Sequence, residues 1–325
     1  MIHITLPITE TRRLSFYLAM EEYVARCLDI ADDCFFLWQV NPSVIFGRNQ
    51  LIENEVNLDY CKANQIETYR RKSGGGCVYA DMSNVMFSYI THDENVNLTF
   101  NRYINLLVFM LFKLGIDAKA NGRNDILIDG KKVSGNAFYH IPHHSIVHGT
   151  MLYDTNMQHM VGSITPTNEK LVSKGVESVR QRIALLKDYT TLSLEELKAF
   201  AIHQLCNDSF SLNEKDVMQI EQIEKEYLTD EFIYGRNPRY SIVKKHRLEG
   251  VGDFEIRIEL KNQIIKQVNI MGDFFLLGDI DKELLMPLRN VAYNQKAVSK
   301  ALPHSVSDII MNLNKTDLLY MLFKD

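Results

Sequence analysis

The stretch from Asn124 to Tyr139 reads NDILIDGKKVSGNAFY and contains the strongest hairpin signal in the chain. Its centre, Asp129-Gly130, is a dipeptide that favours a two-residue β-turn between strands of alternating polarity. The expected cross-strand pairs are Ile128–Lys131, Leu127–Lys132, Ile126–Val133 and Asp125–Ser134. We therefore expect a tight antiparallel hairpin at the middle of the chain.

This register divides the hairpin into two faces, because successive side chains of a strand point in opposite directions. The expected core face carries Ile126, Ile128 and Val133, with Lys131 at its rim. The opposite face carries Asp125, Leu127, Lys132 and Ser134. A lysine in a polar row with an aspartate and a serine is placed to meet a ligand, so the register favours Lys132 over Lys131. The alternative is a surface hairpin with two solvated lysines.

A second segment, Arg70 to Tyr79, reads RRKSGGGCVY. Consecutive glycines let a backbone approach a ligand closely and turn several N–H groups toward one anion. The two arginines can add charge-assisted contacts to a phosphate or a carboxylate. The spacing fits neither a Walker loop nor a dinucleotide-binding fingerprint. A solvated basic loop is the alternative.

A third segment, His148 to Asp154, reads HGTMLYD and follows three further histidines, His140, His143 and His144. Metal sites on helices pair histidines at i and i+4 around an acidic residue, and zinc sites often include cysteines. Neither pattern is present, so we expect no metal here and assign the three histidines to hydrogen bonds at strand ends.

Composition limits the class of protein. The 325 residues suggest about two domains, and 46% hydrophobic with 24% charged residues is typical of a soluble globular chain. A formal charge of -5 argues against a nucleic-acid binder. The longest apolar run, 106–112, is too short to span a membrane. Five scattered cysteines indicate reduced thiols, so we expect a cytoplasmic protein without a secretion signal.

Periodicity predicts the remaining elements. Helices are expected around 17–27, 55–63, 103–114, 193–205 and 217–227, and short helices from about 282 onward. Strands are expected at 35–40, 43–46, 66–70, 85–91 and 254–260, with one more after Asn262-Gln263. The pattern changes near 238–248, so we place a boundary there between a large domain, 1–242, and a small one, 243–325.

Taken in this order, the three segments resemble the lipoate–protein ligases of the biotin/lipoate protein ligase superfamily. Flanking matches are LAMEEYV near the start, IFGRNQ at 45–50, SKGVESVRQRI at 173–183 and YGRNPRYS at 234–241. The resemblance implies an α+β fold: a large mixed-sheet catalytic domain and a smaller α+β accessory domain. It also implies a hinge at 237–247, where the accessory domain reorients.

The resemblance implies an enzyme that works in two steps. Lipoate and ATP, with Mg²⁺, first give lipoyl-AMP and pyrophosphate. The lipoyl group then passes to a lysine of a carrier, either the lipoyl domain of a 2-oxoacid dehydrogenase acyltransferase subunit or the glycine cleavage H protein. Neither a nucleic acid nor a membrane is an implied partner.

The family's residues are carried over position by position. Its nucleotide contacts fall on Arg71, Gly76, Cys77, Val78 and Tyr79, and its pocket lysine falls on Lys132, which the hairpin register selects independently. Further pocket positions match Arg70, Ser73, Gly74, Gly75, Asn84, Asn124, Asp125, Ser134, Gly135, His148, Gly149 and Thr150. Asp125 is the candidate protein ligand for Mg²⁺. The chain departs from the common pattern at Cys77, at Ala80-Asp81 and at Ser83-Asn84, which leaves the preference between lipoate and octanoate open.

Three other functions stay open. An octanoyltransferase of the same superfamily needs no ATP and carries the acyl group on a cysteine. Cys77 abuts the glycine run, whereas Cys206 lies in an expected capped helix, so neither is the expected nucleophile. A non-catalytic lipoate-binding module would have lost its lysine and arginines. Biotin ligation is disfavoured by the Lys-Val-Ser-Gly segment.

Overall fold

The computed structural model describes residues 1–7, 10–93, 95–122, 124–164, 181–234 and 242–324. The chain divides into two compact units. The first contains Met1–Phe46, Ile52–Arg71 and Cys77–Ile233, and the second contains Gly47–Leu51, Lys72–Gly76 and Tyr234–Asp325. The second unit therefore includes two short segments from the N-terminal half of the sequence.

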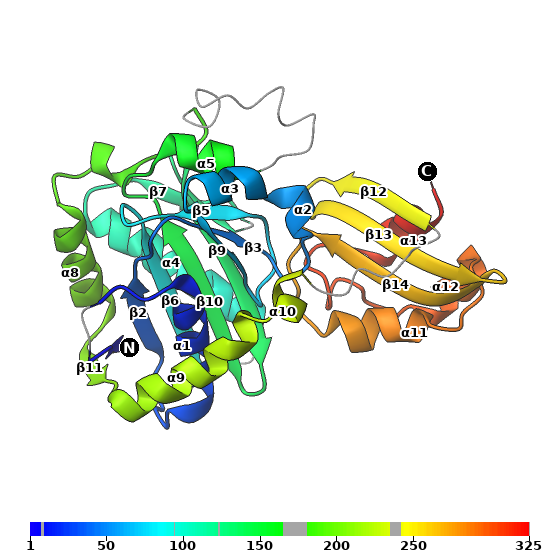
Figure 1. Ribbon diagram of the computed structural model, residues 1–325, viewed down its shortest axis with the longest axis horizontal. Helices are drawn as coiled ribbons and strands as arrows, with labels where there is room; N and C mark the ends of the chain where they lie inside the picture. The colour runs from blue at the N-terminus through cyan, green and yellow to red at the C-terminus, as the bar shows by residue number, and fades with distance from the viewer. Residues whose placement is uncertain (8–9, 94, 123, 165–180, 235–241, 325) are drawn as a thin grey trace. The chain divides into compact units, whose positions relative to one another are not determined.

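The first unit is built on an eight-stranded mixed sheet in the order β11-β1-β2-β6-β10-β9-β8-β7. Its strands are β1 (Ile2–Thr5), β2 (Cys34–Trp38), β6 (Val85–Thr91), β7 (Ala118–Ala120), β8 (Asp125–Ile128), β9 (Lys131–Ile141), β10 (His144–Met151) and β11 (Asp208–Ser211). The edges of the sheet are the short strands β11 and β7. Figure 1 shows β6, β10 and β9 side by side at its centre.

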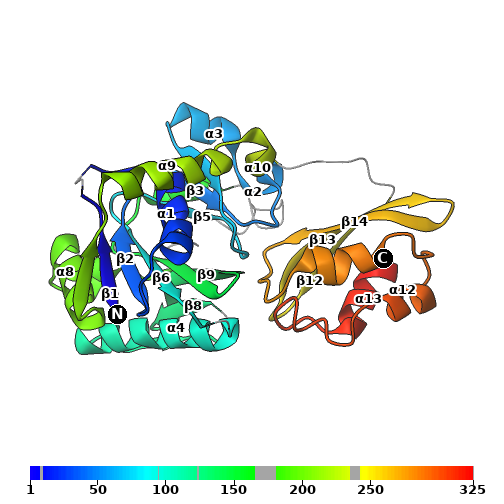
Figure 2. The ribbon, with the colours of Figure 1, turned by 90° about the horizontal axis from the view of Figure 1, so that it is seen from below.

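Helices cover both faces of this sheet, with α4 (Val96–Lys113) on one face and α1 (Leu14–Cys27) with α9 (Glu214–Tyr227) on the other (Figure 2). On the α4 side, Phe100 packs on Phe138 of β9 with ring centroids 4.9 Å apart. Gly115 adopts a φ of 79° just after α4, the left-handed conformation that commonly ends a helix. Further described helices in this part of the chain are α5 (Met157–Ser163), the 3₁₀ turn η1 (Leu186–Asp188), α8 (Leu194–Leu205) and α10 (Asp230–Tyr234).

Helix α1 is buried almost completely, including Glu21 and Glu22. Polar contacts attach α9 to it: Arg13 and Ser15 donate to Glu224 at 2.7 and 2.6 Å, and Tyr23 donates to Asp216 at 2.6 Å. The Glu and Lys content of 217–227 is typical of a solvated helix face. That interpretation is wrong for Glu224, whose carboxylate is buried against α1, as is that of Asp216 just before this range.

A second sheet of the first unit has the order β4-β3-β5. Its strands are β3 (Ser43–Phe46), β4 (Glu67–Arg70) and β5 (Val78–Ala80), and α2 (Ile52–Glu55) and α3 (Leu58–Ala63) lie between them in sequence. Phe46 and Tyr79 belong to the small core beneath these elements. This sheet fixes the two ends of the Arg70–Tyr79 segment, since β4 ends at Arg70 and β5 begins at Val78.

The second unit pairs a three-stranded antiparallel sheet with short helices. Its strands are β12 (Ile242–Leu248), β13 (Gly252–Lys261) and β14 (Ile264–Gly272), joined in that order. The helices are the π-helical turn η2 (Asp281–Leu285), α11 (Met286–Leu288), α12 (Gln295–Ala301) and α13 (Lys315–Phe323). Alternate residues of β13, among them Ile256 and Ile258, are buried in the core that these helices complete.

The expected α+β class, with a large mixed sheet, is confirmed. The helices expected at 17–27, 193–205 and 217–227 and the strand at 85–91 are also observed, and a capping box between Ser193 and Glu196 begins the second of these helices. The helix expected at 55–63 is instead divided into α2 and α3. The matched segments at 173–180 and 235–241, with the first half of the expected hinge, lie outside the described residues. The second half of that hinge, 242–247, forms part of β12.

The glycine run has a packing role within the second unit. Gly75 N–H donates to the carbonyl of Phe274 at 3.1 Å, and Arg48 N–H donates to the carbonyl of Ser73 at 2.9 Å. A Cβ at Gly74 would lie 2.5 Å from the carbonyl oxygen of Phe274, closer than such atoms approach in real proteins. At Gly76 the nearest atom would be the Cβ of Asp273 at 3.9 Å. Gly74 is therefore required by packing, whereas Gly76 has room for a methyl group.

We expect Gly74→Ala to destabilise the second unit by about 1–3 kcal/mol, because the obstructing atom belongs to the backbone and cannot turn away. Gly76→Ala should leave the free energy of unfolding within about 0.5 kcal/mol of the parent. Urea unfolding of the full chain, followed by hydrogen exchange in β14, measures both. Equal stability of the two variants would contradict this account of Gly74.

Candidate active site

The hairpin turn forms as expected and brings Lys132 beside a carboxylate. Asp129 and Gly130 adopt φ values of 51° and 74°, as a two-residue hairpin turn of this kind requires. The pairs Ile128–Lys131 and Leu127–Lys132 are observed. The Lys132 ammonium lies 2.7 Å from Asp125 Oδ1, with 35% of the lysine side chain exposed. Lys131, in contrast, is an exposed residue beside the turn.

Beyond these two pairs the predicted register is wrong. The structure pairs Ile126 with Ser134 and Asp125 with Gly135, because a β-bulge shifts the ladder between Ile126 and Leu127. The bulge gives β9 one extra residue, Val133, so the strict alternation assumed from the sequence breaks there. Ser134 is buried and its hydroxyl donates to Asn136 Oδ1 at 3.3 Å. It therefore does not share a polar row with Asp125.

The shifted register places Asp125 at the end of a continuous row across five strands. In this row Trp38 opposes Met86, Met86 opposes Thr150, Thr150 opposes Gly135, and Gly135 opposes Asp125. Directly opposed residues lie on the same face of a sheet. The Lys132–Asp125 pair therefore lies on the same face of the sheet as Trp38. Helix α1 covers this face near the Trp38 end of the row.

A buried polar chain on the same face joins His148, a matched pocket position, to Glu21 and Ser88, which sequence reasoning missed. Glu21 of α1 accepts from Ser88 Oγ at 2.6 Å and from His148 Nδ1 at 2.9 Å. Ser88 in turn accepts from Trp38 Nε1 at 2.8 Å. A buried carboxylate is stable only when such partners replace water. The sequence signal for this chain was the acidic pair Glu21-Glu22 inside an apolar helix.

We expect Glu21→Ala to reduce the free energy of unfolding by about 3–5 kcal/mol, since it leaves His148 and Ser88 without their buried acceptor. Glu21→Gln keeps the shape and one acceptor oxygen, so its cost should be smaller, about 1–2 kcal/mol. Urea denaturation monitored by the fluorescence of Trp38 measures both variants. If Glu21→Ala lowers the free energy of unfolding no more than Glu21→Gln does, Glu21 is not the buried acceptor for His148 and Ser88.

Two matched pocket residues, Asn124 and Gly149, have structural partners on the opposite face. Asn124 Nδ2 donates to the carbonyl of Asn136 at 3.2 Å, and Asn136 Nδ2 donates to the carbonyl of Asn124 at 3.0 Å. A Cβ at Gly149 would lie 1.9 Å from Asn136 Oδ1. Gly149 therefore makes room for the Asn136 side chain, which cross-links β9 to the loop before β8.

The two arginines differ in their surroundings. The Arg70 guanidinium lies 4.6 Å from the centroid of the Phe46 ring, and its Nε donates to the carbonyl of Ile233 at 2.9 Å. Arg71 is also buried, and its Nη1 donates to the carbonyl of Ile45 at 3.2 Å. Burial lowers the pKa of Arg71 to about 10, so its guanidinium keeps its charge at neutral pH.

Cys77, Val78 and Tyr79 lead from the glycine run into the small sheet, where Tyr79 opposes Val44 and Val78 opposes Ile45. Burial, with a smaller effect of the nearby Glu55 carboxylate, raises the pKa of the Cys77 thiol. The thiol is therefore protonated at neutral pH. Ser73, Gly74, Gly75 and Gly76 belong to the second unit and are described with it above.

Asn84 lies in a turn that Asp81 organises. Asp81 Oδ1 accepts from Ser83 N–H at 2.9 Å, and its Oδ2 accepts from Asn156 N–H at 3.2 Å. Asn84 is fully buried, and its Oδ1 has no hydrogen-bond partner among the residues that the structure describes. Such an orphaned acceptor is rare in a protein interior. It is consistent with the matched pocket position.

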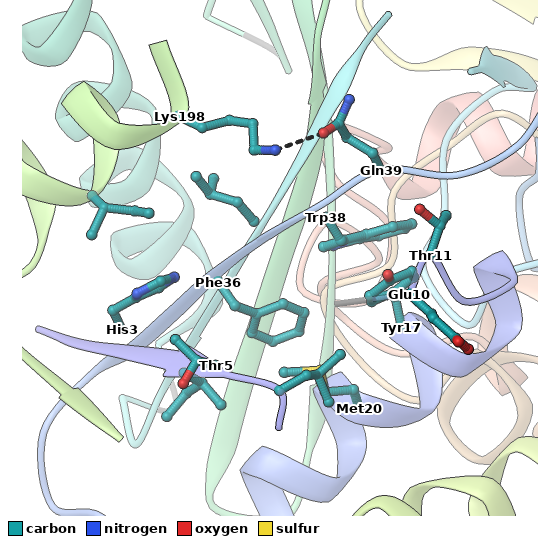
Figure 3. Close-up of a pocket in the computed structure, with 14 residues that line it drawn as sticks. His3, Thr5, Glu10, Thr11, Tyr17, Met20, Phe36, Trp38, Gln39 and Lys198 are labelled. Atoms are coloured by element: carbon teal, nitrogen blue, oxygen red, sulfur yellow. Dashed lines mark hydrogen bonds between the residues drawn. The ribbon is translucent and has the colours of Figure 1, made fainter. Parts of the chain in front are cut away.

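A cavity of about 290 Å³ opens where β1 and β2 part. Their described ladder comprises Ile2–Cys34 and His3–Phe35, after which the strands separate. Figure 3 shows Phe36, Met20 and the stacked pair Tyr17–Trp38 around it, with Lys198 donating to Gln39 at its rim. Of the described residues that line it, Trp38 also belongs to the row that ends at Asp125.

The described residues include neither a metal-holding cluster nor a membrane-spanning helix. No group of three or more His, Cys, Asp and Glu side chains there is arranged to hold a metal ion. None of the helices described combines the length and the apolar character that a membrane span requires.

Comparison with known proteins shows that both parts of the chain match domains of lipoate protein ligases. The model of the lipoyl protein ligase A/B catalytic domain matches residues 14–206, and that of the bacterial lipoate protein ligase C-terminus matches 237–322. The solved structure of P. falciparum LipL1 in complex with lipoate covers 98% of this chain, and the chain covers 96% of it, with a TM-score of 0.76 at 21% identity. That likeness supports the fold alone. A lipoate-protein ligase A bound with ATP is 25% identical, with a TM-score of 0.60, over 72% of this chain and 97% of its own.

Curated sequences then give the family. Lipoate-protein ligase LplJ of Bacillus subtilis is 33% identical over 319 residues, which cover 94% of this chain and 96% of that protein. Lipoate–protein ligase 1 of Staphylococcus aureus is 34% identical over 305 residues, covering 90% and 92%. The chain belongs to the lipoate–protein ligase family, and it is an enzyme of the ligase class.

Proposed function

We propose that this ligase uses the Lys132 ammonium to bring the carboxylate of lipoate and the α-phosphate of ATP together. Both reactants are anionic, so they repel each other unless a cation lies between them. The observation that supports this role is the position of the ammonium: partly exposed, on a sheet face, and 2.7 Å from a carboxylate of the kind it would bind in the substrate.

The reaction would proceed by two displacements. A carboxylate oxygen of lipoate attacks the α-phosphorus, the bond to the bridging oxygen breaks, and pyrophosphate leaves. The amine of a carrier lysine then attacks the acyl carbonyl of lipoyl-AMP, and AMP leaves as an amide forms. Lys132 would stabilise the charge that develops in the first step, a contribution typically worth about 10²–10³ in rate.

We assign the nucleotide contacts to Arg71 and to the segment Gly76–Tyr79. A buried guanidinium that keeps its charge is suited to bind phosphate. Magnesium binds phosphate oxygens readily and needs few protein ligands. ATP would therefore bring the ion with it. A lipoate protein ligase homologue from T. acidophilum with bound lipoic acid, 25% identical to this chain, and the ATP-bound ligase A support both substrates.

For the acceptor we propose the lipoyl domain of a 2-oxoacid dehydrogenase or the glycine cleavage H protein. An archaeal lipoate protein ligase, 27% identical to this chain with a TM-score of 0.65, has been studied with its E2 lipoyl domain. The direct test incubates the enzyme with lipoate, ATP, Mg²⁺ and a purified lipoyl domain, then measures the mass of the domain. Omission of any one component should abolish the mass increase.

Lys132→Ala should reduce pyrophosphate release at least about 10²-fold, because it removes the cation between the two anions. Lys131→Ala should leave the rate within about twofold, since its side chain lies beside the turn. Both variants change the same charge in the same hairpin, so they control for each other. Equal losses would show that the hairpin register does not select the functional amine.

In the octanoyltransferase alternative, a cysteine such as Cys77 would have to act as the nucleophile. A thiolate nucleophile needs a lowered pKa, whereas burial raises the pKa of this thiol. We therefore expect Cys77→Ala to retain lipoyl transfer within about threefold in the presence of ATP, with no acyl-enzyme in the parent by intact-mass analysis. Transfer through a thioester on Cys77 without ATP would identify a transferase instead.

A further inference from the structure

We propose that Asp125 and Gly135 are positioning residues: they hold the Lys132 ammonium on the reactive face of the sheet until anionic substrates replace Asp125. This inference rests on the proposed function, because it concerns how the amine assigned there is placed. It explains why the glycine follows the lysine at a spacing of three residues.

Gly135 provides the surface on which the ammonium lies. A Cβ at this residue would be 2.7 Å from both Cε and Nζ of Lys132, well inside the usual contact distance of 3.5–4.0 Å between carbon atoms. The lysine side chain therefore occupies the space that any larger residue would fill. The bulge at Val133 makes this possible, because it places Gly135 instead of Ser134 opposite Asp125, on the face that carries Lys132.

Asp125 fixes the tip of the lysine, and its own position is fixed in turn. Its Oδ1 faces the ammonium at 2.7 Å, while its Oδ2 accepts from Asn121 Nδ2 at 3.2 Å. The N–H groups of Asn124 and Asp125 both donate to Asn121 Oδ1, at 3.1 and 3.0 Å. The carboxylate thus projects from a loop that is tied by its own side chains.

The backbone of Lys132 is held by a different segment, residues 182–184. Lys132 N–H donates to the carbonyl of Arg182 at 2.8 Å, and the carbonyl of Lys132 accepts from Ala184 N–H at 2.8 Å. Lys132 also forms an isolated parallel bridge with Ile183. With its backbone held on one side and its ammonium on the other, the side chain crosses Gly135 along a defined path.

The ion pair must nevertheless be exchangeable. Both side chains are partly exposed, at 35% and 21%, and pairs in contact with water contribute only about 0–1 kcal/mol. A substrate carboxylate and a phosphate can therefore replace Asp125 at little cost. Asp125 orients the ammonium, which affects kcat. It also competes with the anionic substrates for the ammonium, which affects the KM for lipoate.

The test measures lipoate-dependent ATP–pyrophosphate exchange of the full chain, with the parent and Lys132→Ala as references. In Asp125→Asn we expect kcat to fall about 10–100-fold, because a misplacement of about 1 Å at a reacting group can cost that much. The KM for lipoate should stay constant or fall, since an amide no longer competes for the ammonium. Asp125→Glu should restore part of kcat. Asp129→Asn, the same change at the exposed turn, should alter neither constant.

Gly135→Ala tests the surface beneath the ammonium. The obstructing atoms are the flexible end of a side chain, so thermal stability should change little while kcat falls at least about 10-fold. Parental kcat in both Asp125→Asn and Gly135→Ala would overturn the inference. So would a loss in Asp125→Asn that excess Mg²⁺ restores, which would make Asp125 a metal ligand. Full activity of Lys132→Ala would instead overturn the proposed function itself.

Discussion

One extra residue in β9 determines which residue of that strand lies beneath the Lys132 ammonium. Without the bulge at Val133, Lys132 would still oppose Leu127, but Ser134 rather than Gly135 would oppose Asp125. With it, the ammonium lies over Gly135 and against Asp125. A β-bulge keeps the ladder on both sides while it redirects a side chain, and such irregularities often occur beside active sites. The proposed chemistry depends on this local irregularity.

The same face of the sheet tolerates buried polar groups only because each finds partners in distant segments. Glu21 reaches β6 and β10, and Glu224 of α9 reaches the residues that begin α1. Each contact joins segments more than 60 residues apart in sequence. Burial of a carboxylate in this way contributes little net stability. It makes other arrangements of α1 unfavourable, because they would leave the buried carboxylate without its partners. The helix that covers the sheet is therefore held in one orientation rather than merely packed.

Local patterns predicted much of this structure. Some features depend only on residues that are close together in sequence. They are the Asp129-Gly130 turn, the capping box at Ser193 and the row of apolar residues along α4, and all three are observed. The bulge could not be predicted, because a period of two contains no sign of one inserted residue. The partners of Glu21 lie on β6 and β10, and Asn124, the partner of Asn136, lies in the loop before β8, so only the folded chain defines them. The roles assigned to the site residues remain predictions, and the resemblance to a family contributed most of them.

The two edges of the large sheet have a consequence for the behaviour of the protein in solution. Exposed strand edges offer unpaired backbone groups to other molecules and can initiate aggregation. Here the edges are β11, four residues long with polar ends, and β7, three residues long with the exposed Lys119 at its centre. Short edges and an outward charge disfavour intermolecular strand pairing. Neither described edge is therefore a place where a second copy of the chain would readily add a strand to the sheet.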